Sequence, residues 1–266
     1  MTASSVRNAV FAGLFALLGA GSARAQDFER ITTSLTDTLQ TAIDLLPQGV
    51  NDVRLGIGPG VYPDFEGSRH SSVHAVPVVS LRYRDMIEVI NNEVKVTAFN
   101  HLFAPAVNSD RPGGSLRIGP LVSLNFGRDE KDSIDLKGMG DVHTSLELGA
   151  FVSFLLPNDR FRVRLRQDIA GGHKGATLQF DYTRTLIRAQ RMSLSGSLGL
   201  NAASAAAGLK DANAGINGNY VLTDNWTLFA TVSYERLVGT AKNSPLIRLR
   251  GSASNVTASA FAVYGF

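Results

Sequence analysis

From residue 51 to the end of the chain, apolar and polar residues alternate with a period of two. In the stretch RFRVRLRQD at 160–168, four arginines occupy every second position, and Phe161, Val163 and Leu165 lie between them. Such alternation is typical of β-strands that have one apolar and one polar face. The same pattern runs through 115–127, 142–155, 176–187, 191–201 and 225–236. It predicts an all-β chain of long strands.

The connections between these strands differ in length. Tight turns are expected at 157–159, 189–190 and 223–225, and longer polar loops at 62–72, 127–140, 171–175, 202–210 and 237–253. Short turns that alternate with longer loops are the pattern of an antiparallel transmembrane β-barrel, which points its apolar side chains toward lipid. Because no backbone group can stay unpaired in hydrocarbon, the sheet has to close on itself.

The number of strands can be read only approximately. Eleven spans fit, near 52–62, 73–83, 86–100, 115–127, 142–155, 160–170, 176–187, 191–201, 212–222, 225–236 and 254–266. Single-chain bacterial barrels have an even number of strands. A turn at Asn91–Asn92 would divide the span 86–100 and give about twelve strands, with a short first piece. We favour twelve over the alternative of ten, in which one segment lies outside the wall.

The arginine ladder (Arg160, Arg162, Arg164 and Arg166) is expected to face the barrel interior, because the residues between its members would then face lipid. Uncompensated buried charge is costly, so acids or water have to meet the guanidinium groups. Glu147, Asp168 and Asp181 are the candidate partners. The residues predicted to line the lumen are Arg117, Glu147, Arg160, Arg162, Arg164, Arg166, Asp168 and Asp181.

The first 25 residues are typical of a secretory signal peptide. Arg7 precedes an apolar run at 9–20, and the small-x-small triplet Ala23-Arg24-Ala25 follows it. This order predicts cleavage after Ala25. The apolar run is too short to serve as a membrane anchor.

Residues 26–50 are predicted to contain a short helix. Its apolar residues recur at spacings of three and four, at Phe28, Ile31, Leu35, Leu39, Ile43 and Leu46. Asp27 can cap the start, and Pro47 with Gly49 ends the helix. This segment could cover the edge of the domain, fill the lumen as a plug, or dock a partner in the periplasm. The remaining residues, 51–266, form the predicted barrel.

The composition supports a membrane protein and excludes some partners. Charged residues make up 18% of the chain, where about 25% is usual for a soluble protein. Loss of residues 1–25 would remove two of the 26 basic residues and no acid, which leaves 24 against 23 acids and a net charge of +1. The basic isoelectric point therefore gives no indication of nucleic-acid binding.

Signals for chemistry are weak. The chain has no cysteine, and none of its five histidines stands in a His-Glu-x-x-His arrangement, so neither a cofactor nor a metal site is predicted. The repeat GIGPG at 56–60 lacks the spacing of a dinucleotide-binding loop, and its glycines are expected to let a strand bend or pack closely. His70, His74 and His173 lie in loops with serines or acids, which leaves an outer-membrane hydrolase as a minor alternative.

Several ordered motifs resemble the MipA/OmpV family of outer-membrane proteins. They are GIGPGVYPDFEGS at 56–68, GPLVSLNFGRDE at 119–130, GMGDV at 138–142, LELGAF at 146–151, RQDIAGGHKG at 166–175 and YERLVGTAKNSPL at 234–246. The last strand, which ends on YGF at 264–266, fits as well. The resemblance covers roughly residues 53–266 and leaves 26–49 outside it.

This resemblance implies a non-enzymatic barrel embedded in the lipid of the bacterial outer membrane. The named member of the family is implied to act as a scaffold that brings a lytic transglycosylase together with a peptidoglycan synthase. In this chain the periplasmic turns and residues 26–49 would form the contact surface. Two alternatives stay open: a narrow porin-like channel whose arginines favour anions, and a surface adhesin.

Overall fold

The computed structural model describes residues 51–266 apart from 85, 104–112, 173 and 207. The predicted signal peptide at 1–25 and the predicted helix at 26–50 lie outside the described residues. No described helix is long and apolar enough to cross a bilayer.

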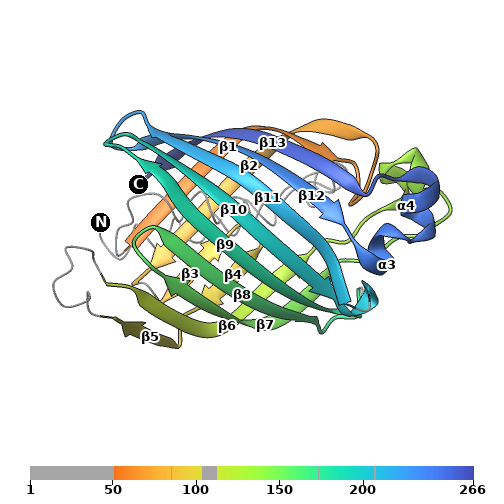
Figure 1. Cartoon of the computed structure of the whole chain (residues 1–266), viewed down its shortest axis with the longest axis horizontal. Helices are drawn as coiled ribbons and strands as arrows, with labels where there is room; N and C mark the ends of the chain where they lie inside the picture. Colours follow the sequence, from red (N-terminus) through yellow and green to blue (C-terminus); the bar gives the residue numbers. More distant parts are fainter. Residues whose placement is uncertain (1–50, 85, 104–112, 173, 207) are drawn as a thin grey trace.

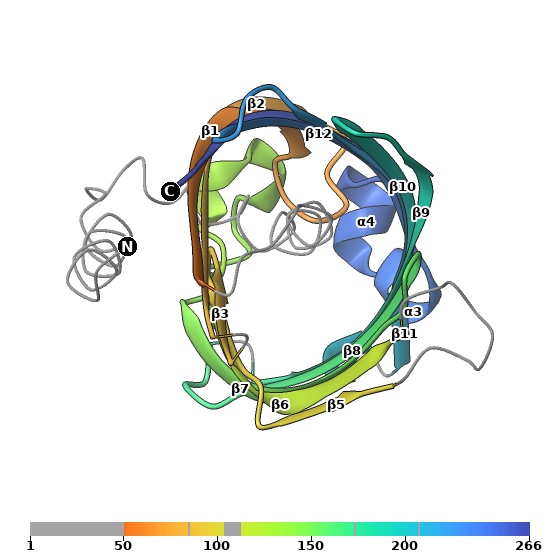
Figure 2. The same cartoon turned by 90° about the vertical axis from the view of Figure 1, so that its left-hand side faces the viewer.

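The described residues form one antiparallel sheet that closes into a barrel (Figures 1 and 2). Its strands are β1 (Asn51–Pro63), β2 (Ser71–Tyr83), β3 (Ile87–Ile90), β4 (Glu93–Val96), β5 (Phe99–Leu102), β6 (Ser115–Asn125), β7 (Ser145–Leu155), β8 (Asp159–Asp168), β9 (Ala176–Arg188), β10 (Met192–Ala203), β11 (Gly208–Val221), β12 (Trp226–Leu237) and β13 (Ser254–Gly265). The pairing of β1 with β13 closes the barrel. Because β4 and β5 both pair with β6, these two short strands together occupy one position in the wall. The closed barrel therefore has twelve strands, which confirms the favoured count.

The turn at Asn91–Asn92 separates β3 from β4, as the sequence predicted. Asn91 adopts a left-handed backbone with φ of 46°, a conformation that Asn tolerates better than most residues. Its backbone N–H donates to the Val79 carbonyl at 2.9 Å, and its side-chain oxygen accepts from the Val79 N–H at 2.9 Å. The turn is thus fastened to the edge of β2 through both bonds.

The sequence predicted one division of the span 86–100, at Asn91–Asn92, but the structure has a second interruption, which separates β4 from β5. Lys95 pairs with Leu121 and Phe99 pairs with Ile118, so four steps along β4 and β5 face three steps along β6. This extra residue is a β-bulge. Every second residue of β6 points its backbone N–H and carbonyl groups toward β4 and β5. Pro120 is one of these residues, and proline has no N–H to donate. The ladder breaks at the position where the donor is missing.

The connections divide between the two ends of the barrel (Figure 1). Tight turns join β7 to β8, β9 to β10 and β11 to β12 at the end that carries the C-terminus. Apart from the connection between β5 and β6, the longer loops lie at the opposite end, and they contain η1 (Glu130–Asp132), η2 (Ile134–Leu136), η3 (Ser204–Ala206), α3 (Gly239–Lys242) and α4 (Pro245–Arg250). We call these the short-turn end and the loop end.

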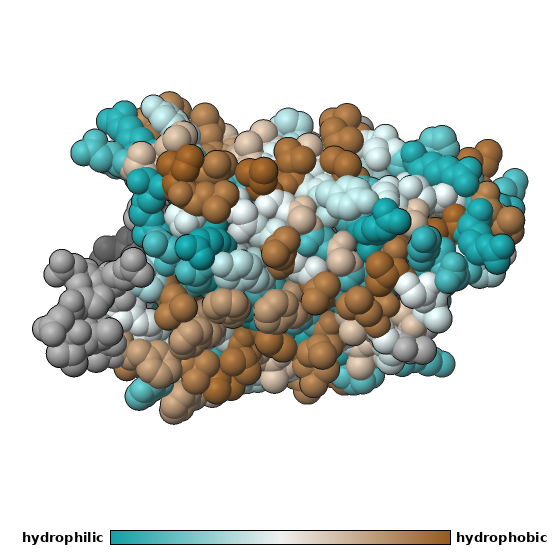
Figure 3. All heavy atoms as spheres, in the orientation of Figure 1, coloured by the Kyte–Doolittle hydropathy of each residue, from teal (hydrophilic) through white to brown (hydrophobic). Residues whose placement is uncertain are grey.

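Apolar side chains cover the outer flank of the barrel. Leu165, Leu178, Leu198, Ile216 and Val232 are all exposed there, on the consecutive strands β8 to β12. Figure 3 shows apolar residues spread along this flank, with hydrophilic residues gathered mostly toward the ends. Exposed apolar area on this scale is unfavourable in water and favourable against lipid.

The glycine repeat of β1 permits a close approach to β13. A Cβ atom placed on Gly58 would lie 1.8 Å from the carbonyl oxygen of Ala260. Only a residue without a side chain fits this contact. The structural reading of GIGPG as a site of close packing is therefore correct.

Candidate functional site

The arginine ladder lies on the inward face of β8. Arg164 is 1% exposed, whereas its neighbour Leu165 is 51% exposed on the outer face. Arg162 is also buried, and Arg160 and Arg166 are half-buried. The two-residue period of the strand therefore separates charge from lipid, as alternation in a membrane barrel requires.

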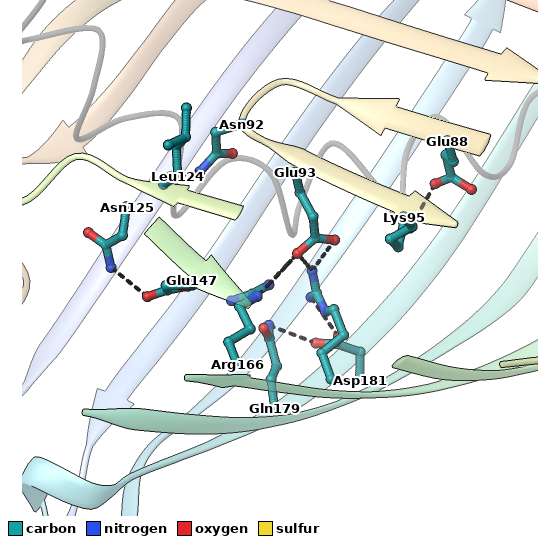
Figure 4. A network of polar contacts seen from close by, with 11 residues as sticks. Glu88, Asn92, Glu93, Lys95, Leu124, Asn125, Glu147, Arg166, Gln179 and Asp181 are labelled. Atoms are coloured by element: carbon teal, nitrogen blue, oxygen red, sulfur yellow. Dashed lines mark hydrogen bonds and ion pairs between the residues drawn. The ribbon is translucent and has the colours of Figure 1, made fainter. Parts of the chain in front are cut away.

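Glu93 on β4 is the central partner of this ladder (Figure 4). Its carboxylate accepts from Arg166 Nη2 at 2.8 Å and from Arg166 Nε at 3.1 Å. Arg164 Nη1 lies 3.4 Å from the same carboxylate, while Arg164 Nη2 donates to Asp181 at 2.9 Å. We call Glu93, Arg164, Arg166 and Asp181 the Glu93 cluster. It joins β4, β8 and β9 through side chains rather than through the backbone ladder.

Small inward residues leave room for these long side chains to meet. The strands β6 and β7 lie between β4 and β8. Their inward residues include Ser123, which pairs with Glu93, and Gly149, which pairs with Arg166. A Cβ on Gly149 would lie 1.9 Å from the Leu165 carbonyl oxygen, so this position carries no side chain. The guanidinium of Arg166, which pairs with Gly149 across the ladder, can therefore extend toward Glu93.

The other acids that the sequence singled out have different surroundings. Glu147 is buried and accepts from Asn125 Nδ2 at 3.2 Å. Asp168 accepts from the backbone N–H groups of Ala170 and Gly171, both at 2.9 Å, and of Lys174 at 2.6 Å, which organises the loop after β8. Arg117 is half-buried on β6.

Sequence reasoning missed Glu93 and a second polar group beside it. Lys95 donates to Glu88 at 2.8 Å, and Arg82 lies 3.4 Å from the same carboxylate. Glu88, Glu93 and Lys95 belong to strands of four residues, which are too short to display a clear period. One usable signal was present: after the turn at Asn91–Asn92, Glu93 and Lys95 alternate with two valines.

A cavity of about 650 Å³ occupies the loop half of the barrel. Glu147, Arg166 and Asp181 line it from the wall. Ile247 of α4 lines it from the loop end, where Ser68 bridges to Gly251 and Arg250 donates to the Asp135 carbonyl at 3.1 Å. Loops from three separate parts of the chain are thus tied together over this side of the lumen.

The described residues give no geometric support to the hydrolase alternative. The side chain of His70 is 68% exposed and lies 3.9 Å from Asp135, whereas Ser72 donates to Asp64 at 2.6 Å. His173 lies outside the described residues. Within the part of the chain that is described, no group of three His, Cys, Asp or Glu residues could hold a metal ion.

Comparison with known proteins gives one family and several barrels of low similarity. The model of the family described as MltA-interacting protein MipA matches residues 55–207 and 195–266. No curated protein matches the sequence. Solved structures that resemble it include the NanC porin, with 16% identity over 80% of this chain and 98% of that one and a TM-score of 0.41. An outer membrane channel from Pseudomonas putida F1 has 13% identity, coverage of 83% and 97%, and a TM-score of 0.37. OmpT of Vibrio cholerae has 7% identity, coverage of 83% and 99%, and a TM-score of 0.36.

Proposed function

This chain belongs to the MipA family and is an integral β-barrel of the bacterial outer membrane, and from that premise we propose that it is a non-enzymatic scaffold. Its partners would be a lytic transglycosylase and a peptidoglycan synthase. The name of the family, MltA-interacting protein, supports the first of these partners. The second is an expectation from the family resemblance.

The Glu93 cluster is the observation that favours a structural role over conduction. An anion-selective pore needs positive side chains that are available to the passing ion. Here Arg164 and Arg166 are both held by Glu93, and Arg164 also by Asp181. A buried, ion-paired interior fixes the shape of the barrel, which is what a scaffold requires of its membrane anchor.

The docking surface of such a scaffold would be the short-turn end, since short turns of outer-membrane barrels face the periplasm. Arg188 and Arg191 flank the exposed turn between β9 and β10 at this end. Two exposed arginines beside one turn suit an acidic partner surface. We therefore expect this turn to contribute to capture of the murein enzymes.

Affinity capture from detergent extracts tests the proposal. The tagged full-length chain is expected to enrich a peptidoglycan synthase and a lytic transglycosylase, identified by mass spectrometry. Reversal of charge by Arg188→Glu with Arg191→Glu is expected to reduce this enrichment. The matched control is Lys242→Glu with Arg248→Glu, which places the same change at the exposed loop end. Absence of both enzyme classes from the unmodified sample would rule out the scaffold role.

A narrow channel is the second candidate, and the cavity of about 650 Å³ is the observation that favours it. Planar-bilayer recordings of the folded barrel decide between closed and conducting lumens. If current passes, Arg162→Gln with Arg164→Gln should lower the preference for anions, because these side chains supply positive charge to the interior. A folded barrel that passes no current excludes this candidate.

A further inference from the structure

The strand β5 has an open edge. It pairs with β6 from Phe99, opposite Ile118, to Leu102, opposite Ser115, and it stands at one end of the strand order. Among the described residues no strand pairs with its other side, and in Figures 1 and 2 none lies beyond it. All four of its residues are exposed. The barrel is thus closed through β4 and leaves β5 paired on one side alone.

The edge is open because the neighbouring turn stops short of it. The turn between β2 and β3 reaches Met86, whose carbonyl accepts from the Thr97 N–H at 2.7 Å. β3 then begins at Ile87, opposite Val96, so it runs beside β4. β5 begins at Phe99, beyond this contact, and continues along the short-turn end, where the described parts of β2 and β3 supply no partner.

The alternation of β5 shows which of its backbone groups are available. The Phe103 N–H donates to the Gly114 carbonyl at 2.8 Å, so the odd-numbered residues of this stretch point their backbone groups toward β6. The N–H and carbonyl groups of Asn100 and Leu102 therefore point toward the open edge. Unpaired groups of this kind are a template for pairing with another strand.

The side chains of the odd-numbered residues form an aromatic row that continues onto β7. The ring centroids of Phe99 and His101 lie 6.3 Å apart, those of His101 and Phe103 4.8 Å, and those of Phe103 and Phe154 5.5 Å. Phe99 is 52% exposed and Phe103 is 39% exposed. A strand added to β5 would place every second side chain beside this row, and apolar side chains form the favourable cross-strand pairs with aromatic rings.

The place of β5 along the barrel makes its edge reachable from the periplasm. Open sheet edges do not occur against hydrocarbon, because their backbone groups would stay unpaired. β5 lies at the short-turn end (Figure 1), and aromatic residues of outer-membrane barrels gather at the membrane interface. The edge therefore lies at the periplasmic border of the membrane, at the same end as the turn that carries Arg188 and Arg191.

The β5 strand of a second copy does not fit this edge. A twofold axis that relates two paired identical strands runs either perpendicular to their sheet or along the strands. In a barrel wall the first axis lies in the membrane plane, and the second is tilted from the membrane normal by about 35–45° together with the strands. Copies that share the orientation of one membrane are related by rotation about its normal. The protein that can approach this edge in an extended conformation is a periplasmic partner.

We propose that an extended segment of the lytic transglycosylase, with apolar side chains at every second position, adds to β5 as a further strand. This inference rests on the proposed scaffold function and specifies how the partner is held. Hydrogen bonds to the backbone of Asn100 and Leu102 provide affinity, and the aromatic row provides specificity for the apolar side chains.

Proline substitutions test the backbone contact, because proline has no N–H. Asn100→Pro and Leu102→Pro leave the bonds between β5 and β6 in place, so the thermal transition and the unboiled gel mobility should be retained. Each should reduce capture of the lytic transglycosylase by the tagged full-length chain about fivefold, the effect of one lost hydrogen bond. The matched controls Asn100→Ala and Leu102→Ala keep the N–H and should capture almost as much as the unmodified chain.

Hydrogen exchange followed by mass spectrometry gives a second readout on the unmodified protein. In the purified complex with the lytic transglycosylase, the amides of 99–102 should exchange several-fold more slowly than in the free barrel, because those of Asn100 and Leu102 become hydrogen-bonded. The segment 130–136 at the loop end is the internal control, and its exchange should not change.

Three results would overturn this inference and leave the scaffold function standing. They are equal capture by the proline variants and the unmodified chain, equal losses with proline and alanine, and unchanged exchange of 99–102 in the complex. Loss of a dimer of this chain in the proline variants, with capture unchanged, would assign the edge to a second copy instead. If the unmodified chain captures no lytic transglycosylase, the proposed function itself fails, and this inference fails with it.

Discussion

The strands from β8 to β13 and the three strands β3 to β5 build the same wall in different ways. Each strand from β8 to β13 has 10–14 residues and pairs along most of its length with both neighbours. The strands β3, β4 and β5 have four residues each. Among the described residues, β2 pairs through thirteen positions with β1 but through only four with β3. We call 87–102 the interrupted region.

The difference shows how a barrel can stay closed where its backbone ladder is short. In the long strands, backbone hydrogen bonds hold neighbours together, and inward side chains are free to be Ser, Asn or Gly. In the interrupted region, Glu93 reaches from β4 to β8 and the Asn91 side chain bonds to β2. Side-chain bonds therefore carry part of the closure that the backbone carries elsewhere.

Removal of the Glu93 carboxylate should cause the largest loss of stability in the interrupted region. Glu93→Gln leaves the buried Arg164 and the half-buried Arg166 without their shared acid, and breaking a buried ion pair costs about 3–5 kcal/mol. The temperature at which the folded band disappears from unboiled gels should fall clearly. Emission of Trp226, the single tryptophan, gives a second readout from the long-strand side.

Glu66→Gln is the matched control for that substitution. Glu66 also forms an ion pair, at 2.8 Å from Lys210, but its side chain is 48% exposed. Exposed pairs contribute about 0–1 kcal/mol. If the two substitutions lowered the transition temperature equally, the Glu93 cluster would have no special part in closing the barrel.

Two glycines permit a direct comparison of the regions by the same substitution. A Cβ on Gly58, in the long ladder of β1 and β13, or on Gly119, opposite the bulge between β4 and β5, would lie 1.8 Å from a carbonyl oxygen of the neighbouring strand. Gly58→Ala should cost about 1–3 kcal/mol, the usual range for overpacking. Gly119→Ala should cost less, because the broken ladder can shift.

The measurement is again the thermal transition in detergent. Gly196→Ala is the control, since the nearest atom to its added Cβ would be Leu186 Cδ1 at 3.6 Å, an ordinary contact. A larger loss for Gly119→Ala than for Gly58→Ala would show that the interrupted region is the more rigid of the two.

Two substitutions at Asn91 distinguish the cost of backbone strain from the cost of a lost hydrogen bond in the interrupted region. Asn91→Gly keeps the left-handed turn and loses only the bond to the Val79 N–H, at a cost of about 1 kcal/mol. Asn91→Ala adds about 1–2 kcal/mol of left-handed strain. The glycine variant should therefore melt between the native protein and the alanine variant. The reverse order would mean that β3 and β4 reach another turn conformation.

The sequence predicted the two regions unequally well, for a physical reason. The span expected at 160–170 is observed as β8 at Asp159–Asp168, because ten alternating residues define both period and face. Four residues cannot do this, so within 86–100 the sequence indicated the turn at Asn91–Asn92 but not the second interruption, between β4 and β5. The pairing of Glu93 with Arg164 joins residues 71 positions apart. It depends on how β4 meets β6, which no local pattern encodes.

The smallest effect is expected at Asp168, an acid that serves the long-strand region locally. Its carboxylate holds three backbone N–H groups of the loop that follows β8. Asp168→Asn replaces one acceptor oxygen by a donor, so about 1 kcal/mol should be lost, and the loss should be confined to this loop because the ladders of β8 remain intact. Faster tryptic cleavage after Lys174, with little change in the thermal transition, is the expected result. A fall in transition temperature as large as that of Glu93→Gln would show that both wall regions depend equally on buried acids.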